Sequence, residues 1–201
     1  MAGVDPRANR CGHRVSLLRV RSDQREQRCQ IEQAVLITGV YGSGKSSVAE
    51  EMAAVLEEHN APYALLDLDF LAWFDTGGEG GPTEHRMMLT NLAALVGNYL
   101  DVGVRFFILA KAVRDAAELE DLRAGLPMPL KVVRLTVPME EIEERLSHDV
   151  TTGRRNDLRE AVAWVAASFG VGIEDVTVPN DRPIREVAID VLDWLGWWER
   201  G

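Results

Sequence analysis

The feature that most constrains this chain is a glycine-rich run that matches the pattern G-x-x-x-x-G-K-[ST] at every fixed position. Its residues are Gly39, Val40, Tyr41, Gly42, Ser43, Gly44, Lys45 and Ser46. In a phosphate-binding loop (P-loop) of this kind, the glycines let backbone N–H groups wrap around a phosphate. We expect Lys45 to reach the β- and γ-phosphates, Ser46 to ligate Mg²⁺, and Ser47 to bind the nucleotide together with the loop.

The residues on either side of this loop fit a strand before it and a helix after it. Residues 34–38 form a continuous apolar run, which is typical of a buried parallel strand. After the loop, Val48, Met52, Val55 and Leu56 share one helical face, and glutamates occupy other positions. A strand, a glycine loop and a helix are the arrangement that phosphate binding needs. The sequence therefore predicts a nucleoside triphosphate site.

The composition limits the other classes of function. The 201 residues suffice for one domain with a full core, and 46% of them are hydrophobic. A net charge of −10 argues against a nucleic-acid partner, because such proteins neutralise phosphates. We expect no membrane span and no signal peptide, since no long apolar run is present. Cys11 and Cys29 form no disulfide or metal pattern, so a cytoplasmic location is expected.

Residues 1–30 differ from the rest of the chain. They hold seven arginines against three acidic residues and show no sustained apolar period. We expect them to form a basic, disordered N-terminal extension, because termini are usually disordered unless they are tied down. A basic tail that docks on an acidic surface is the alternative. Residues 31–201 are then the P-loop domain.

An acidic pair follows in a second expected strand, residues 63–70. Asp67 and Asp69 are two positions apart, so in a strand they point the same way. The carboxyl end of a strand is where open α/β sheets bind ligands. We therefore expect both carboxylates to be functional, the alternative being solvated loop residues that cap the next element. Trp73 and Phe74 then either stack on a ligand or belong to the core.

Cationic residues are expected at the same edge. A third strand over residues 104–110 leads into Lys111 and Arg114. A fourth strand and a helix precede the arginine-dense residues 148–159, where Arg154 and Arg155 are candidates to stabilise charge on a transferring phosphoryl group. The alternative for these arginines is a salt-bridged surface pair of helices.

Three helices complete the pattern. Thr83 is expected to cap a helix that runs from residue 84 to about residue 101. A helix after the arginine-dense stretch should turn Val162, Val165 and Phe169 inward. The chain then closes with a short strand over residues 175–178, a turn, and a helix over residues 184–198. The tryptophans of that last helix should dock it on the core, and they are Trp194, Trp197 and Trp198.

Over residues 33–198 this order of elements resembles the small P-loop kinases, which include adenylate, shikimate, gluconate and adenylylsulfate kinases, antibiotic phosphotransferases and zeta-type toxins. The resemblance implies a three-layer α/β/α fold with a parallel five-stranded sheet in the order 2-3-1-4-5. It implies ATP and Mg²⁺ as ligands, with Asp67 or Asp69 positioning the acceptor or a Mg²⁺-bound water. The further residues that it implies are Arg114 after strand three, the lid arginines Arg145, Arg154 and Arg155, and Asn180 and Arg182 beside the adenine.

The departures from these families leave the acceptor unassigned. The second strand ends in Asp-Leu-Asp-Phe where adenylylsulfate kinases have Asp-Gly-Asp, and no acid ends strand three. We expect an ATP-dependent, Mg²⁺-requiring phosphotransferase that acts on a small molecule. Asp67 should hold a Mg²⁺-bound water and Asp69 should orient or deprotonate the acceptor hydroxyl. The alternative is a nucleotide-gated regulator or toxin-like ATPase that acts through a protein partner. The oligomeric state stays open.

Overall fold

The computed structural model describes residues 32–74, 82–147 and 152–198, so the expected extension over residues 1–30 lies outside the described residues. The strands are β1 (Gln33–Thr38), β2 (Tyr63–Asp67), β3 (Phe106–Ala110), β4 (Leu130–Thr136) and β5 (Val176–Pro179). The helices are α2 (Lys45–Glu58), α3 (Pro82–Asp101), α4 (Ala116–Ala124), α5 (Met139–Ser147), α6 (Thr152–Ala166) and α7 (Ile184–Leu195). A 3₁₀ helix, η1 (Leu68–Ala72), follows β2. No described helix is long and apolar enough to cross a bilayer.

The five strands form one sheet in the order β2-β3-β1-β4-β5, and every neighbouring pair is parallel. This confirms the predicted α/β fold and strand order. The central strands are buried along almost their whole length, as expected of strands covered on both faces. The register aligns their carboxyl ends, with Asp67 opposite Ala110 and Ala110 opposite Ile37. Side chains that follow the strands therefore meet at one edge of the sheet.

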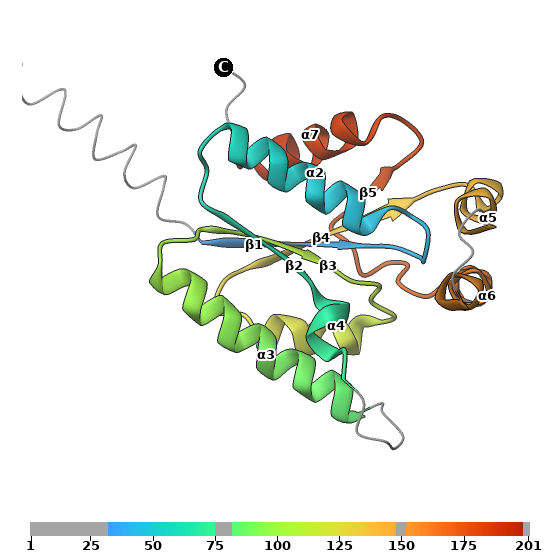
Figure 1. Ribbon diagram of the computed structural model, residues 1–201, viewed down its shortest axis with the longest axis horizontal. Coiled ribbons are helices and arrows are strands. Elements are labelled where there is room, and N and C mark those ends of the chain that lie inside the picture. Colours follow the sequence, from blue (N-terminus) through green and yellow to red (C-terminus); the bar gives the residue numbers. More distant parts are fainter. Residues whose placement is uncertain (1–31, 75–81, 148–151, 199–201) are drawn as a thin grey trace, which may run out of the picture. The chain divides into compact units, whose positions relative to one another are not determined.

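Helices cover the two faces of the sheet and bury one core layer on each (Figure 1). α3 and α4 cover one face, where Met88, Leu92 and Val96 are buried against the sheet. α2 and α7 cover the other. The four apolar residues expected on the inner face of α2 are all fully buried, and they are Val48, Met52, Val55 and Leu56.

α7 ends at Leu195, with Gly196 as its left-handed C-cap, and not at residue 198 as predicted, so two of the three expected tryptophans dock from the segment after the helix. Trp197 is buried, stacks on Phe106 and donates a hydrogen bond to Gln33 at 2.8 Å. Trp198 is partly buried against the same core layer. Trp194 is 43% exposed, so its predicted docking role was wrong. It lies outside the buried stripe of the helix, with the Lys131 ammonium 5.9 Å from its ring.

Two further helix predictions need correction. α3 begins at Pro82, so Thr83 lies inside the first turn and is not the cap. Proline suits that first position because its φ is already helical and its missing N–H needs no partner. In α6 the inward residues are Ala161 and Trp164, both buried.

The inward face predicted for α6 was wrong, because Val162 and Val165 are about half exposed and Phe169 lies beyond the end of the helix, 39% exposed. The rotation of α6 about its own axis instead turns its largest side chain, Trp164, toward the core. The Trp164 ring packs edge-on against Tyr41 and Phe169, with centroids 6.0 and 5.6 Å away. A buried indole brings a large apolar area to this contact.

Candidate active site

A cleft of about 930 Å³ opens at the carboxyl edge of the sheet, next to the P-loop. P-loop residues, both aspartates of the acidic pair and groups from α5, α6 and the β5–α7 turn share its walls. The lining residues are Tyr41, Gly42, Gly44, Lys45, Ser46, Ser47, Asp67, Asp69, Phe70, Trp73, Ala110, Lys111, Arg145, Leu146, Asp157, Asn180 and Ile184.

The P-loop backbone takes a shape that only glycine supports at its ends. Gly39 and Gly44 have φ angles of 145° and 89°. A Cβ on Gly39 would lie 2.8 Å from the Leu135 carbonyl oxygen, and one on Gly44 would lie 2.5 Å from the Asn180 amide. Gly44 is also the N-cap of α2, and it places no side-chain acceptor on the first turn. The N–H groups of that turn therefore have no side-chain cap, as suits an anion site.

Lys45, the first residue of α2, lines the cleft. Its Nζ donates a hydrogen bond to the Val40 carbonyl oxygen at 3.1 Å and lies 5.3 Å from the centroid of the Tyr41 ring. Burial lowers the pKa of Lys45 to about 8, and the carboxylates of Asp69 and Asp67 oppose part of that shift. A buried ammonium with a lowered pKa gains most from an anionic partner such as a phosphate.

Ser46 and Asp67 form the pair best suited to a magnesium ion. The Ser46 hydroxyl donates a hydrogen bond to Asp67 Oδ2 at 2.9 Å, so the two oxygens lie together in the cleft. Hydroxyl and carboxylate oxygens fit Mg²⁺, which is usually bound by one or two protein ligands, waters and substrate phosphates. Among the described residues no group of three or more His, Cys, Asp or Glu side chains could hold a metal. The donor set thus suits a metal that arrives with a nucleotide.

The acidic pair lies differently from the extended strand that its spacing predicted. β2 ends at Asp67, and Asp69 lies inside η1. The strand stops there because the Asp67 side chain accepts a hydrogen bond from the Asp69 backbone N–H at 3.1 Å and so caps the 3₁₀ turn. Both carboxylates nevertheless line the cleft.

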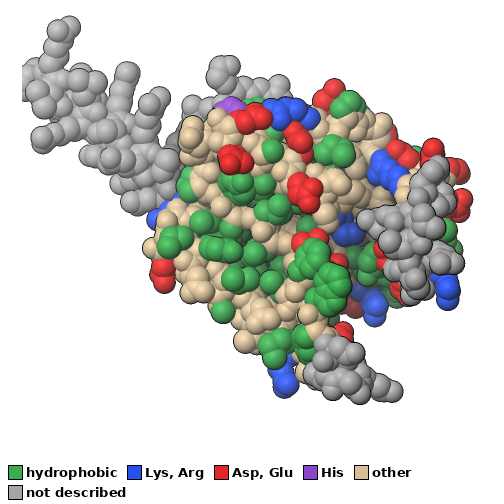
Figure 2. Space-filling model, in the orientation of Figure 1, with side chains coloured by type: hydrophobic (Ala, Val, Ile, Leu, Met, Phe, Trp, Pro, Cys, Tyr) green, Lys and Arg blue, Asp and Glu red, His purple; other side chains and the backbone are tan. Residues whose placement is uncertain are grey.

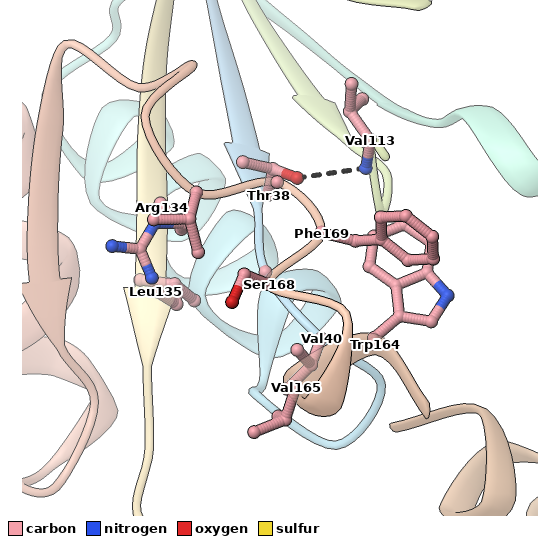
Figure 3. Close-up of a pocket in the computed structure, with 12 residues that line it drawn as sticks. Thr38, Val40, Val113, Arg134, Leu135, Trp164, Val165, Ser168 and Phe169 are labelled. Atoms are coloured by element: carbon pink, nitrogen blue, oxygen red, sulfur yellow. Dashed lines mark hydrogen bonds between the residues drawn. The ribbon is translucent and has the colours of Figure 1, made fainter. Parts of the chain in front are cut away.

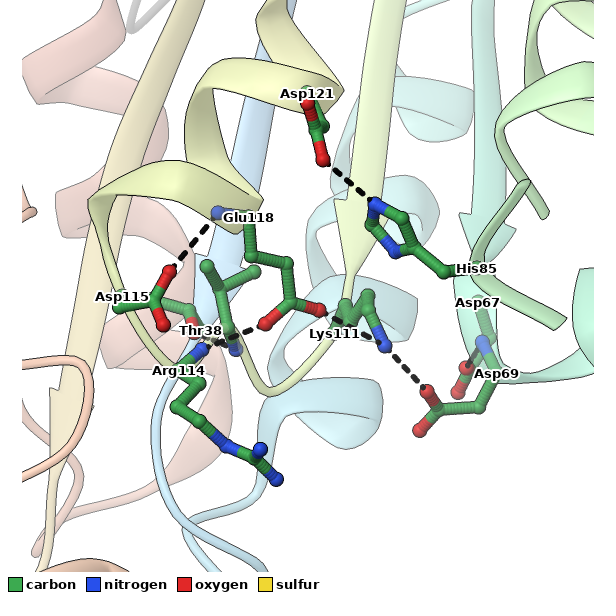
Figure 4. A network of polar contacts seen from close by, with 10 residues as sticks. Thr38, Asp67, Asp69, His85, Lys111, Arg114, Asp115, Glu118 and Asp121 are labelled. Atoms are coloured by element: carbon green, nitrogen blue, oxygen red, sulfur yellow. Dashed lines mark hydrogen bonds and ion pairs between the residues drawn. The ribbon is translucent and has the colours of Figure 1, made fainter. Parts of the chain in front are cut away.

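Lys111 connects the acidic pair to α4. Its Nζ lies 3.4 Å from Asp69 Oδ1 and 3.5 Å from Glu118 Oε1, so one lysine faces two carboxylates (Figure 4). The second Asp69 oxygen is turned away from Lys111 (Figure 4). Glu118 also accepts a hydrogen bond from the Arg114 backbone N–H, and Asp115 caps α4 through the Glu118 N–H. This network fixes Lys111 and leaves it largely neutralised.

Arg114 follows β3 as expected, but its guanidinium does not line the cleft. It lies 5.3 Å from the Phe169 ring and 5.9 Å from the Trp164 ring, outside the wall of the cleft. Its backbone carbonyl accepts a hydrogen bond from the Gly170 N–H at 2.7 Å. In this structure Arg114 therefore joins the post-β3 loop to the end of α6, and its expected contact with a phosphate stays a prediction.

The β5–α7 turn supports the P-loop from the other side. Asn180 is buried and donates a hydrogen bond to the Ser43 carbonyl oxygen at 2.8 Å. Arg145 of α5 donates to the carbonyl oxygens of Asn180 and Gly42, at 3.0 and 3.3 Å, and pairs with Glu141. Both residues line the cleft, beside the loop that would hold the nucleotide.

The remaining arginines of the expected nucleotide site lie elsewhere or outside the described side chains. Arg182 pairs with Asp190 of α7 at 2.6 Å and does not line the cleft. Arg154 and Arg155 are residues of α6, and the structure describes their backbone but not their side chains. Their expected contact with the phosphates stays a prediction.

Sequence reasoning missed several residues of the cleft, and two of them, Phe70 and Asp157, bear on its chemistry. Phe70 was taken as the end of a strand, and its place in η1 instead turns it to the surface beside Trp73. Asp157 comes from the arginine-dense stretch and lines the cleft from α6. The pKa of Tyr41 is raised, first by burial and then by the charges of Asp69 and Asp157. Only the spatial arrangement reveals these two, because neither belongs to a motif.

A second, smaller cavity of about 160 Å³ lies between the start of the P-loop and the end of α6. Trp164 and Phe169 line one side of it and Arg134 lies on the other (Figure 3). The Thr38 hydroxyl accepts a hydrogen bond from the Val113 N–H at 3.1 Å at its edge (Figure 3). None of its lining residues is shared with the larger cleft, and none is a carboxylate. The acidic candidates therefore all belong to the larger cleft.

Comparison with solved structures identifies the fold as that of the small P-loop kinases. The chain is 20% identical to an unliganded sugar kinase from a Janibacter species, with a TM-score of 0.60 over 83% of this chain and 95% of that one. It is 24% identical to the Mycobacterium tuberculosis APS kinase solved with AMPPNP and APS, with a TM-score of 0.55 over 83% and 98%.

A third similar structure is the Acinetobacter baumannii shikimate kinase solved with shikimate, which is 18% identical, with a TM-score of 0.52 over 85% of this chain and 96% of that one. No family model and no curated protein matches the sequence. The comparisons therefore show the fold and leave the subfamily unresolved.

Proposed function

We propose that this protein is an ATP-dependent phosphotransferase that uses Mg²⁺ and acts on a small molecule. The observation that carries this proposal is the convergence of Lys45, the Ser46–Asp67 pair and Asp69 in one cleft at the P-loop. Phosphoryl transfer asks a protein mainly for positioning and for charge stabilisation. The cleft supplies backbone N–H groups, one buried ammonium, a donor pair for the metal and a carboxylate for the acceptor.

Each of these groups has a separate task in the proposed reaction. The first turn of α2 and Lys45 bind the phosphates, and Asn180 with Arg145 holds the loop in its binding shape. Ser46 and Asp67 would hold Mg²⁺, which would supply positive charge to offset that of the phosphates. The acceptor oxygen forms a bond to the γ-phosphorus as the bond to the ADP oxygen breaks, and Asp69 receives the hydroxyl proton.

Binding of Mg²⁺-ATP by calorimetry tests the first half of this proposal. The full-length protein should bind Mg²⁺-ATP, and Lys45→Met should weaken binding and lower turnover by at least about 100-fold, because it removes charge stabilisation from the transferring group. Circular dichroism should show an unchanged fold, since the Lys45 side chain donates one hydrogen bond, to a carbonyl of its own loop. A wild-type protein that does not bind Mg²⁺-ATP would contradict the proposal.

The second half concerns the acceptor. ADP release should depend on an added small molecule, and the phosphorylated product should appear by ³¹P NMR. A regulator that acts through a protein partner predicts the opposite result, with slow hydrolysis that no small molecule accelerates. The two outcomes separate the proposal from its alternative even before the acceptor is identified.

A further inference from the structure

Phe70 and Trp73 form an exposed aromatic pair at the end of β2. Their ring centroids are 5.4 Å apart and their planes meet at 26°, so the rings are stacked. Phe70 is 63% and Trp73 is 79% exposed, whereas the Tyr41 ring in the same cleft is only partly exposed. We call these two residues the aromatic shelf. A stacked pair with this much open ring surface suits a third ring that extends the stack.

The aromatic shelf belongs to the cleft that holds the catalytic candidates. Both of its residues line that cleft, and Phe70 directly follows Asp69 in η1. The space-filling view shows hydrophobic side chains at the surface between α2 and α3, with acidic side chains next to them (Figure 2). A small molecule whose hydroxyl reaches Asp69 therefore lies in the same cleft as the shelf. This continuity with the proposed site indicates what covers the shelf.

The charges beside the shelf disfavour an anionic acceptor. Lys111, which pairs with Asp69, also faces Glu118, and its Nζ lies 3.4 Å from the Asp69 carboxylate and 3.5 Å from the Glu118 carboxylate. Asp157 adds a carboxylate from α6, and the Lys45 ammonium lies where the phosphates bind. Among the described side chains, an acceptor with its own negative charge would meet carboxylates and a neutralised lysine, so an uncharged acceptor fits these groups better.

In the described part of the cleft, the polar groups next to the shelf in the chain are already paired with other protein groups. Asp69 pairs with Lys111, and Asp67 accepts hydrogen bonds from the Ser46 hydroxyl and the Asp69 N–H. A polyhydroxylated ligand needs a partner for most of its hydroxyls, because unpaired buried polar groups are costly. One carboxylate beside two apolar rings suits one hydroxyl beside one apolar ring.

We propose that the acceptor is an uncharged alcohol with a planar aromatic or heteroaromatic ring, stacked on Phe70 and Trp73 with its hydroxyl at Asp69. This inference rests on the proposed phosphotransfer. The acceptor oxygen gains the γ-phosphoryl group, the proton of its hydroxyl goes to Asp69, and ADP leaves. The shelf sets affinity for the ring, while Asp69 acts on the hydroxyl.

Ligand binding can be measured first without nucleotide. The probes are adenosine, uridine and 2-phenylethanol as ring alcohols, glucose and myo-inositol as polyols without an aromatic ring, and adenosine 5′-monophosphate as an anionic counterpart. At least one ring alcohol should quench the fluorescence of Trp73, identified as the part of the signal that Trp73→Phe removes. The polyols should give no quenching, and the monophosphate should bind about tenfold or more weakly than adenosine.

Turnover with Mg²⁺-ATP is measured second, with variants of the shelf. Phe70→Ala and Trp73→Ala should each raise KM for the ring alcohol about tenfold, because stacking of a base on an aromatic side chain is worth ~1–3 kcal/mol. kcat should change less than about threefold, and Trp73→Phe should retain most of the affinity. Trp194→Ala is the matched control, an exposed tryptophan on α7 outside the cleft, and it should change neither constant.

Three results would overturn the inference while leaving the phosphotransferase intact. In the first, the protein phosphorylates a polyol with a KM that Trp73→Ala does not change. In the second, it prefers adenosine 5′-monophosphate to adenosine. In the third, Mg²⁺-ATP binds, but no ring alcohol quenches the fluorescence of Trp73 or supports turnover. A protein that does not bind Mg²⁺-ATP would instead overturn the proposed function, and the fluorescence titration would still decide whether the shelf binds rings.

Discussion

Lys45 shows how one buried side chain links pH to ligand binding. Burial lowers its pKa to about 8, so the ligand-free protein loses this charge within an accessible pH range. Bound phosphates favour the ammonium form and raise the pKa again. The protonation state of Lys45 and nucleotide affinity are therefore coupled.

This coupling predicts proton uptake on nucleotide binding. At a pH about half a unit above that pKa, part of the Lys45 population is neutral before the nucleotide binds and becomes charged when it binds. Calorimetry in two buffers with different ionisation enthalpies should therefore give different apparent heats of binding. Affinity for Mg²⁺-ATP should fall as pH rises from about 7 to about 9.5, because the charged form of Lys45 becomes less populated. Lys45→Met should abolish the proton uptake. Equal heats in both buffers, with a flat pH profile, would show that Lys45 stays charged throughout.

The acidic pair gives a second residue-scale prediction. Asp67 accepts a hydrogen bond from the Ser46 hydroxyl, whereas Asp69 forms an ion pair with Lys111, so the two carboxylates have different neighbours. Asp67→Asn should raise the Mg²⁺ concentration needed for half-maximal activity about tenfold, since it removes a charged ligand. Asp69→Asn should lower kcat about 100-fold with little change in ATP affinity, since it removes a general base. Titrations of Mg²⁺ and ATP against initial rate measure both effects, and identical phenotypes would show that the two residues share one role.

At the scale of elements, the sequence predicted the strands and helices that apolar periodicity determines. It missed a strand end that depends on a side-chain cap and a helix face that depends on tertiary packing. The buried strands and α2 follow from continuous apolar runs and helical spacing. The end of β2 does not, because the Asp67 side chain competes with the sheet for the Asp69 N–H. The face of α6 was also missed, since its phase depends on which residue reaches Tyr41 across the fold. Trp164 makes that contact, and no local pattern records it.

The P-loop depends on a neighbouring element in the same way. Asn180, from the β5–α7 turn, donates a hydrogen bond to the Ser43 carbonyl oxygen in a buried position. Asn180→Ala should lower the free energy of unfolding by ~1–3 kcal/mol, because a buried acceptor loses its donor. It should also weaken Mg²⁺-ATP binding. Urea denaturation and calorimetry measure the two effects.

Asp181→Ala is the control for this prediction, because it changes the exposed neighbour of Asn180 in the same turn. It should alter stability by no more than ~0.5 kcal/mol, as expected for a surface substitution. If Asn180→Ala matched the control in both measurements, the turn would not hold the loop in its binding shape.

At the scale of the whole molecule, the proposed nucleotide site depends on several elements at once. The cleft takes its walls from the P-loop, α2, η1, α5, α6 and the β5–α7 turn, whose alignment comes from the parallel register of the sheet. The sequence predicted this edge as the site because the P-loop and Asp67 both follow strands. A ligand bound there contacts segments far apart along the chain, so it should stabilise the fold as a whole rather than one part of it.

Thermal unfolding measures that stabilisation. Mg²⁺-ATP at about 100 times its Kd should add ~2.7 kcal/mol, which for a domain of this size raises Tm by roughly 5–11 °C. Chelating the metal with EDTA should remove most of the increase, because Ser46 and Asp67 then have no cation to share with the phosphates. Lys45→Met should lose the increase even with Mg²⁺ present. An increase that is the same with EDTA would show that the nucleotide binds without the metal and that the Ser46–Asp67 pair has another task.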